Sequence, residues 1–276
     1  MKKITLFLFM LLSITGFAQK KQKIKGNKEV LIKKFLVPVF TGVEVGEHFE
    51  INLQKATDTT RVVIETDDNL FDVIHFNVDQ GVLKFNTSME IVKKKRLRIT
   101  VFVPQNFNNI RLIEKGKVFN DEMLNLESLQ MEALDKSRAE LNLHIAKDLN
   151  LTGRGKANLD MEVYARKADI YLTENARIKG VVNIEDVNLK LDDHAKVDWE
   201  GNVNYLDLKI KNKAAFESEK LTIQKVDLKA YDKTRVIIKV NNKIDMKLSG
   251  KSETYLYGKP KTNLKSFEDN AVLYKK

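Results

Sequence analysis

Residues 187–197, VNLKLDDHAKV, and residues 206–216, LDLKIKNKAAF, repeat one pattern, the second stretch starting 19 positions after the first. In both stretches apolar residues alternate with polar ones, and a short polar turn that ends in a small residue follows. Alternation with a period of two is typical of a β-strand with one buried face. The two stretches therefore predict short strands joined by a recurring turn.

The turn occurs nine times between residues 114 and 271, as an acidic residue, Asn or Gly, then a basic residue, His or Asn, then a small residue. The small residues are 18 to 21 positions apart. The nine turns are Glu114-Lys115-Gly116, Asp135-Lys136-Ser137, Gly153-Arg154-Gly155, Glu174-Asn175-Ala176, Asp193-His194-Ala195, Asn212-Lys213-Ala214, Asp232-Lys233-Thr234, Gly250-Lys251-Ser252 and Asp269-Asn270-Ala271. Gly, Asn and Asp tolerate left-handed backbone conformations, so the motif suits a sharp corner without any ligand.

Two architectures accommodate such strands, an antiparallel meander and a coil in which each repeat is one rung. Meanders usually carry two-residue Asn-Gly or Asp-Gly turns, which are absent from the repeat region. The constant register of the turn instead predicts an all-β, single-chain parallel β-helix over residues 111–276, with rungs of about 19–20 residues that bury a shared core. Residues 35–110 are also strand-like and either begin this coil or cap its open end, where unpaired backbone groups would otherwise recruit other chains.

The N-terminus predicts export. Lys2 and Lys3 precede an apolar run from Ile4 to Ile14, and small residues follow before Gln19, so residues 1–18 resemble a secretory signal peptide. A membrane-spanning helix is the alternative, but spanning requires ~20 apolar residues. Residues 19–34 form a basic leader that we expect to be flexible. The mature protein is expected in the periplasm, at the cell surface or secreted, with no transmembrane span.

Several stretches resemble a known family, the "putative auto-transporter adhesin head" or GIN domain of secreted and envelope proteins of Bacteroidota. They are Phe40-Thr41-Gly42-Val43-Glu44-Val45, Asp68-Asn69-Leu70, residues 79–85 (DQGVLKF), residues 99–104 (ITVFVP) and Tyr257-Gly258-Lys259-Pro260. The resemblance covers residues 38–276 and implies a right-handed β-helix without established enzymatic activity. The chain departs from the family in its turns, none of which reads Gly-Ser-Gly.

A second column of polar residues lies seven positions before the small residue of most turns: Gln130, Asp148, Asp169, Asn188, Asp207, Asp227 and Asp245. Basic residues often follow two positions later, as at Lys190, Lys209, Lys229 and Lys247. Opposite charges on neighbouring columns favour ion pairs along the sheet. Calcium between the aspartates is the alternative, although the calcium-binding repeat Gly-Gly-x-Gly-x-Asp is absent.

The turns themselves carry a set of basic residues that we name the basic ridge. When rungs stack at ~4.8 Å, these side chains form a positive line along the rod. Such a line attracts polyanions, including acidic polysaccharide and other envelope polyanions. One alternative is that the ridge is only a solvated face. Another is that the protein is a structural scaffold or protein-interaction module that binds an envelope protein. The ridge comprises Lys136, Arg138, Arg154, Lys156, Arg177, Lys196, Lys213, Lys233 and Arg235.

The sequence offers little support for catalysis or cofactors. There is no Cys, and the four His (His48, His75, His144, His194) are not at metal-ligand spacing. The most site-like cluster is Asp192-Asp193-His194, with Asp232 expected one rung along. We therefore predict no catalytic residues, no metal and no cofactor, and a polysaccharide-active enzyme on a β-helix is only the third hypothesis. Aromatic residues are not interleaved with the ridge, so sequence-specific nucleic-acid binding is not expected.

Overall fold

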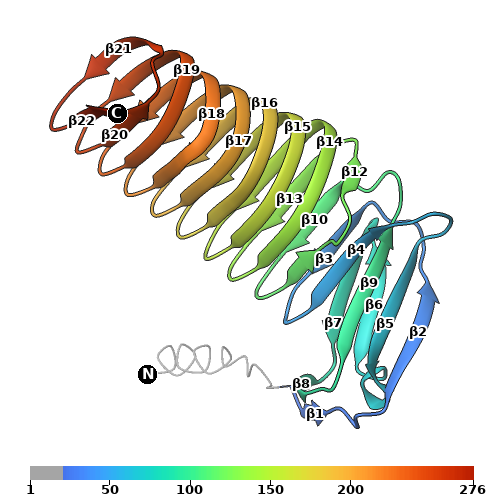
Figure 1. The fold of residues 1–276 in the computed structure, drawn as a ribbon. Coiled ribbons are helices and arrows are strands. Elements are labelled where there is room, and N and C mark those ends of the chain that lie inside the picture. The colour runs from blue at the N-terminus through green and yellow to red at the C-terminus, as the bar shows by residue number, and fades with distance from the viewer. Residues whose placement is uncertain (1–20) are drawn as a thin grey trace, which may run out of the picture.

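The computed structural model describes residues 21–276, which form 22 strands and one short 3₁₀ helix. Figure 1 shows a long coil of stacked strands with a smaller sheet region at its N-terminal end. The signal peptide predicted for residues 1–18 lies outside the described residues. Within residues 21–276 no helix has the length and hydrophobicity needed to cross a membrane.

The coil is a β-solenoid of about nine turns in which the strands pair in parallel with those of the neighbouring rungs, as β15 does with β14 and β16. This confirms the parallel β-helix. Its strands are β10 (Asn109–Leu112), β11 (Lys117–Phe119), β12 (Leu124–Leu126), β13 (Leu129–Ala133), β14 (Arg138–Gly153), β15 (Asn158–Leu172), β16 (Arg177–Leu191), β17 (Lys196–Ile210), β18 (Ala215–Ala230), β19 (Arg235–Leu248), β20 (Glu253–Tyr257), β21 (Lys261–Phe267) and β22 (Val272–Lys275).

The core of the coil consists of the apolar residues that the alternation predicted to point inward. In register across three rungs, Leu206, Val226 and Ile244 are stacked and buried. The largest enclosed side chain is Trp199, which meets Phe216 of the next rung edge-on with ring centroids 6.4 Å apart. Identical inward positions on successive rungs thus build one continuous core along the rod.

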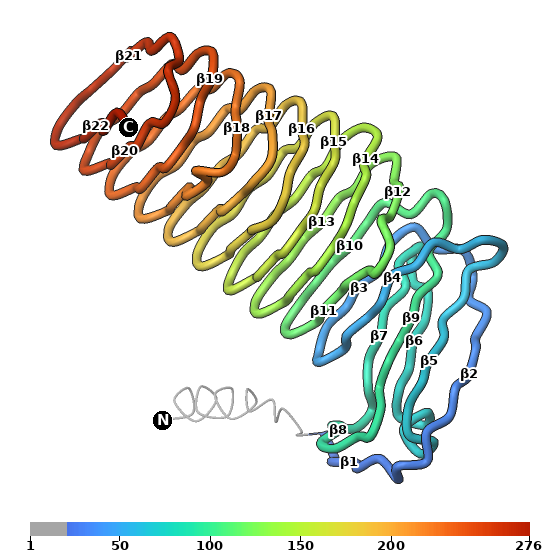
Figure 2. Tube along the Cα trace, viewed as in Figure 1, coloured from blue at the N-terminus to red at the C-terminus, as the bar shows by residue number. Residues whose placement is uncertain are grey.

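Each rung turns at the predicted corner, and we name the sheets on its two sides the pre-corner face and the post-corner face. One residue per corner has a left-handed backbone: Glu114, Asp135, Gly155, Glu174, Asp193, Asn212, Asp232, Gly250 and Asp269. The N–H of the next residue donates to the carbonyl of the left-handed residue one rung earlier, as His194 does to Glu174 at 2.8 Å. Backbone hydrogen bonds therefore continue through the corner, and Figure 2 shows the corners stacked.

One corner was assigned to the wrong register in the sequence. Gly155 is the left-handed residue and Ala157 is the buried small one, so the turn is Gly155-Lys156-Ala157 and not Gly153-Arg154-Gly155. Accordingly Asn150, not Asp148, lies in the polar column, in register with Gln130 and Asp169. Gly153 and Gly155 both fit the first position of the motif. Strand pairing selects Gly155, which also evens the intervals between small residues from 18 and 21 positions to 20 and 19.

The N-terminal region is both a start of the coil and a cap. Strands β3 (Gly42–Val45) and β4 (Glu50–Lys55) form a rung directly before β10 and β11. Below it, β7 (Val82–Thr87) pairs in parallel with β3, and β9 (Leu97–Val103) pairs in parallel with β4. The first rung in space therefore comes from residues that follow the second rung in sequence.

Antiparallel strands then end the stacking. Strand β6 (Ile74–Asp79) pairs antiparallel with β7, and β5 (Arg61–Asp67) pairs antiparallel with β9. Strand β2 (Val30–Leu36) adds to the outer side of β5. The remaining elements are β1 (Lys23–Lys25), β8 (Glu90–Lys93) and η2 (Asp68–Leu70). A change of strand direction covers the open rung that a parallel coil would leave unpaired.

The basic leader is ordered wherever the structure describes it. Strand β1 pairs with β8, and β2 pairs with β5 along its whole length. The expectation of a flexible segment over residues 19–34 was therefore wrong from Lys21 on. Its lysines made the segment look like a linker, but Ile24 of β1 and Phe35 of β2 pack against the core, and both strands pair along the edge of a sheet.

Candidate functional site

The basic ridge follows the corners as two columns. Lys136, Lys156, Lys213 and Lys233 occupy the residue after the left-handed position, and Arg138, Arg177, Lys196 and Arg235 begin the strands of the post-corner face. Arg154 alone lies before the left-handed residue, because of the corrected register. All nine side chains are exposed. The structure thus brings eight of the predicted residues into two adjacent columns and leaves one beside them.

Most ridge residues have no ion-pair partner among residues 21–276. The exception is Arg235, which lies 3.2 Å from Glu217 and 3.5 Å from Glu253 and stacks on the ring of Tyr255. The other eight guanidinium and ammonium groups are available to an external anion. Their spacing along each column follows the rung spacing of ~4.8 Å wherever successive rungs carry a basic residue.

The corner carboxylates beside the ridge make a different kind of contact. The carboxylate of Asp193 accepts hydrogen bonds from the Thr173 hydroxyl at 2.9 Å and from the Glu174 N–H at 3.3 Å. Asp135 similarly accepts from the N–H of Glu114 at 2.8 Å, and Asp269 from the N–H of Gly250 at 2.9 Å. These carboxylates bind the backbone of the preceding rung, so they stabilise the corner more than they neutralise the ridge.

On the pre-corner face, by contrast, the carboxylates of the polar column are bound by neighbouring side chains. Asp245 is nearly buried and lies 2.6 Å from Lys243 and 3.6 Å from Lys265. Hydrogen bonds from Lys243 and Asn263 hold the pKa of Asp245 below its usual range. Four lysines lie two positions after a residue of the polar column and were expected to pair with its carboxylates: Lys190, Lys209, Lys229 and Lys247. Only Lys229 does so, with Asp207 of the preceding rung at 3.5 Å. Two lysines two positions before the column pair with it instead, Lys167 with Asp169 and Lys243 with Asp245.

The cluster at Asp192-Asp193-His194 does not form a site. Asn212, not Asp232, occupies the corner next to Asp193, so Asp232 is two rungs away. Asp192 is bound to Lys211 at 2.7 Å and accepts from the Asn212 amide. Within residues 21–276 there is no group of three or more His, Asp or Glu side chains placed to hold a metal ion.

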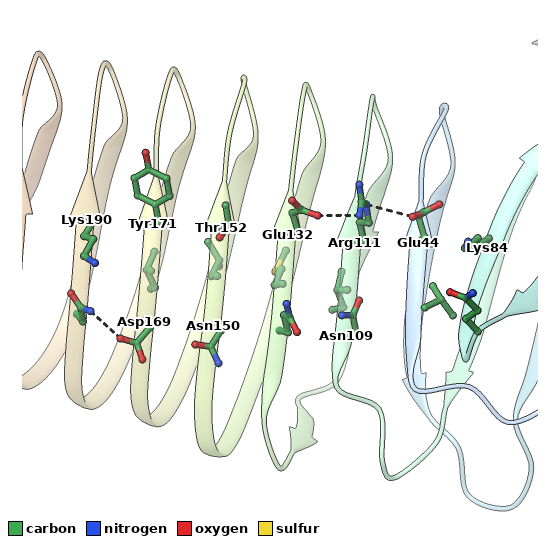
Figure 3. Close-up of a pocket in the computed structure, with 18 of the residues that line it drawn as sticks. Glu44, Lys84, Asn109, Arg111, Glu132, Asn150, Thr152, Asp169, Tyr171 and Lys190 are labelled. Carbon is green, nitrogen blue, oxygen red and sulfur yellow. Dashed lines mark hydrogen bonds and ion pairs between the residues drawn. The ribbon is translucent and has the colours of Figure 1, made fainter.

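Sequence reasoning missed a groove of about 630 Å³ on the pre-corner face, beside the cap. Figure 3 shows its floor, which runs from β7 across β3, β10, β13, β14 and β15 to β16. Side chains of the polar column line it, among them Asn109, Gln130 and Asn150, with Thr152 and Tyr171 in the next column. The signal that could have revealed it was the run of amides in one column, which the wrong register at residue 150 concealed.

The chain belongs to the family described as "Putative auto-transporter adhesin, head GIN domain", which matches residues 39–151 and 144–260. This confirms the resemblance seen in the sequence. Among curated proteins none matches the chain. The two matches overlap within β14; the first covers most of the cap and the corners at Glu114 and Asp135, and the second covers the six corners from Gly155 to Gly250.

Solved structures of similar fold support the architecture. The crystal structure of "a putative adhesin" from Parabacteroides merdae superposes with a TM-score of 0.67 at 16% identity, over 92% of this chain and 99% of that one. A "putative adhesin" from Parabacteroides distasonis gives 0.63 at 13% identity, over 92% and 100%. A "putative lipid binding protein" from the same species gives 0.60 at 12% identity, over 92% and 100%. At these identities the likeness concerns the fold alone.

Proposed function

We propose that this protein is a non-enzymatic, adhesin-like binding module of the cell envelope, and that its basic ridge binds acidic polysaccharide or another envelope polyanion. The observation that carries the proposal is the absence of ion-pair partners, among the described residues, for eight of the nine ridge side chains. Membership of a family described as adhesins agrees with export and with a binding role.

The physical basis is the grouping of unpaired cations. Lys190, Lys209 and Lys247 of the pre-corner face also lack an ion-pair partner among residues 21–276, but they lie beside the carboxylates of the polar column, whereas the eight unpaired ridge residues follow the corners together. A lysine already held by a carboxylate gains little from a second anion, whereas an exposed and unpaired column offers its full charge. The corner carboxylates reduce the positive potential of the ridge, but their lone pairs are directed at backbone N–H groups. A linear polyanion lying along the rod would contact successive rungs, so its affinity should increase with chain length.

The test compares two variants of equal charge. In the ridge variant Lys136, Arg138, Lys156, Arg177, Lys213 and Lys233 are changed to Gln. In the face variant six lysines of the pre-corner face are changed to Gln, namely Lys190, Lys209, Lys225, Lys229, Lys247 and Lys265. Binding to a uronate-rich polysaccharide and to a neutral polysaccharide is measured by biosensor at low and physiological salt.

We expect the wild type to bind the acidic polysaccharide in a salt-sensitive manner, and the ridge variant to lose at least about tenfold in affinity. The face variant should retain most of the binding, because its ridge is intact. Since the two variants have the same net charge, a difference between them cannot arise from overall charge. Equal losses in both would show that overall charge, and not the ridge, is responsible. No binding by the wild type would overturn the proposal and direct the search to protein partners.

A further inference from the structure

The groove beside the cap contains three consecutive amides in register. Asn109 pairs with Gln130, and Gln130 pairs with Asn150, on adjacent rungs. The residues that follow them, Ile110, Met131 and Leu151, are buried, so the amide side chains point outward into the groove. Stacked rungs place the three amides ~4.8 Å apart along the rod.

The hydrogen-bonding capacity of these amides is unused within the described chain. None of the three side chains makes a hydrogen bond to another residue of the range 21–276. Elsewhere in the same column the amides are engaged: Asn188 donates to Asp169 at 3.0 Å, and Asn263 donates to Asp245 at 2.6 Å. Each free amide offers two donors and a carbonyl acceptor. The groove therefore presents a row of neutral groups that can both donate and accept.

The charged side chains of the groove largely neutralise one another. Arg111 lies between Glu44 at 3.5 Å and Glu132 at 3.4 Å, as the dashed lines in Figure 3 show. At the cap, Lys84 is 2.8 Å from Asp79. Farther along, Asp169 is paired with Lys167 at 3.0 Å. Lys190, at the β16 end of the groove, is the one charged lining residue without an ion-pair partner among residues 21–276. The other groups left free are uncharged, and opposite charges offset one another along most of the groove, which favours an uncharged ligand.

A tyrosine adds an apolar surface to this row. Tyr171 projects from β15 beside the amide column, and Figure 3 shows its ring standing out from the floor. A phenol ring combines a flat apolar face with a polar tip. Flat aromatic faces pack against the C–H faces of sugar rings, while amides pair with their hydroxyl groups.

We propose that this groove binds an uncharged, linear oligosaccharide, with about one sugar ring per rung. The column from Asn109 to Asn188 spans five rungs, or about 19 Å, and the rise of one pyranose in an extended chain is close to the rung spacing. A groove of about 630 Å³ is within the range of ligand sites. A peptide is less suitable, because the rungs here are paired on both sides and provide no open strand edge.

The experiment uses an array of linear, uncharged oligosaccharides of one to about six hexoses, in gluco, galacto and manno configurations, followed by calorimetry on the hits. The test variant is Gln130→Ala with Asn150→Ala. The matched control is Asn183→Ala with Asn202→Ala, two exposed amides in register on neighbouring rungs of the other face. Tyr171→Ala and Tyr171→Phe separate the ring from the hydroxyl group, and thermal unfolding verifies that each variant is folded.

We expect affinity to rise with chain length up to about five sugars and to change little with salt. The test variant should lose about tenfold, as the loss of two neutral hydrogen bonds implies, and the control should bind like the wild type. Tyr171→Phe should retain more affinity than Tyr171→Ala. The ridge variant should bind as well as the wild type, since the groove is a separate site.

Three results would overturn the inference: no uncharged oligosaccharide binds at millimolar concentration, the test variant binds as tightly as the wild type, or the control loses as much as the test variant. Binding of acidic glycans alone would contradict the groove proposal while supporting the ridge. Binding of uncharged oligosaccharides alone, with no binding of acidic glycans, would contradict the ridge proposal while supporting the groove. The two proposals can therefore fail separately.

Discussion

The corners and the pre-corner face of the same coil use the same residue types to different ends. Both surfaces carry a column of carboxylates beside columns of lysines. On the face, around β17 to β19, the carboxylates of Asp207 and Asp245 are held by lysine ammonium groups. At the corners, the carboxylates of Asp135 and Asp193 accept backbone N–H groups, and the neighbouring lysines remain unpaired.

The difference arises from backbone conformation. A corner aspartate has a positive φ, 56° at Asp193, which turns its side chain toward the preceding rung, where an N–H group is within reach. A strand aspartate projects perpendicular to the sheet and finds only side chains of its neighbours. Composition alone therefore does not indicate which lysines are free to bind an anion.

The most disruptive test of this comparison is overpacking of a corner. The side chain of Ala195 is fully buried between the small residues of adjacent corners. We expect Ala195→Leu to lower the free energy of unfolding by about 1–3 kcal/mol, because the added atoms must displace a close-packed neighbour. Urea unfolding measures this value. The adjacent, exposed substitution Lys196→Leu should change it by no more than about 0.5 kcal/mol; similar effects for both would mean that the corners are not tightly packed.

A smaller effect is expected when the two kinds of aspartate are removed. Asp193→Ala eliminates the acceptor of three hydrogen bonds, one of them long, and places Ala in a left-handed conformation, so we expect a loss of about 1–2 kcal/mol in unfolding free energy. Asp207→Ala removes a half-exposed ion pair and should cost at most about 1 kcal/mol. Asp193→Gly, which relieves the backbone, separates the two contributions at the corner. If Asp207→Ala were the more damaging change, the proposed division of roles would be wrong.

The smallest effect concerns pH. Because its partners lower the pKa of Asp245 in the folded state, this carboxylate stabilises the fold at neutral pH. That contribution is lost as the pH falls below about 4 and through the lowered folded-state value. Asp245→Asn should therefore be less stable than the wild type at pH 7, and the difference should decrease on acidification. A difference that is constant with pH would show that charge at this position does not stabilise the fold.

Much of the fold was predictable from the repeat. Alternating apolar residues determine which side of each strand is buried, and Val118, Leu159, Ile178, Val197, Phe216 and Val236, which follow the small residue of the corner, are all in the core. The left-handed position was also visible as a column of Asp, Asn, Glu and Gly. One corner failed, because small residues at 153 and 155 fit the motif in two registers.

The cap and the groove were not predictable in this way. Strands β7 and β9 stack before β3 and β4 although they follow them in the chain, and no local pattern encodes that order. The groove depends on it, since the turn between β6 and β7 closes one end with Asp79 and Gln80. The free amides of Asn109, Gln130 and Asn150 became a row only when strand pairing aligned them.

The sequence by itself determined the secondary structure, the inward face, the corners and the family, because these depend on local periodicity and on which residues tolerate a left-handed backbone. Only the tertiary structure decided which charges are paired, which amides are free, and how the first rung is covered. Those properties depend on contacts between residues about 20 or more positions apart, whose register is set by the pairing of whole strands and not by any single residue.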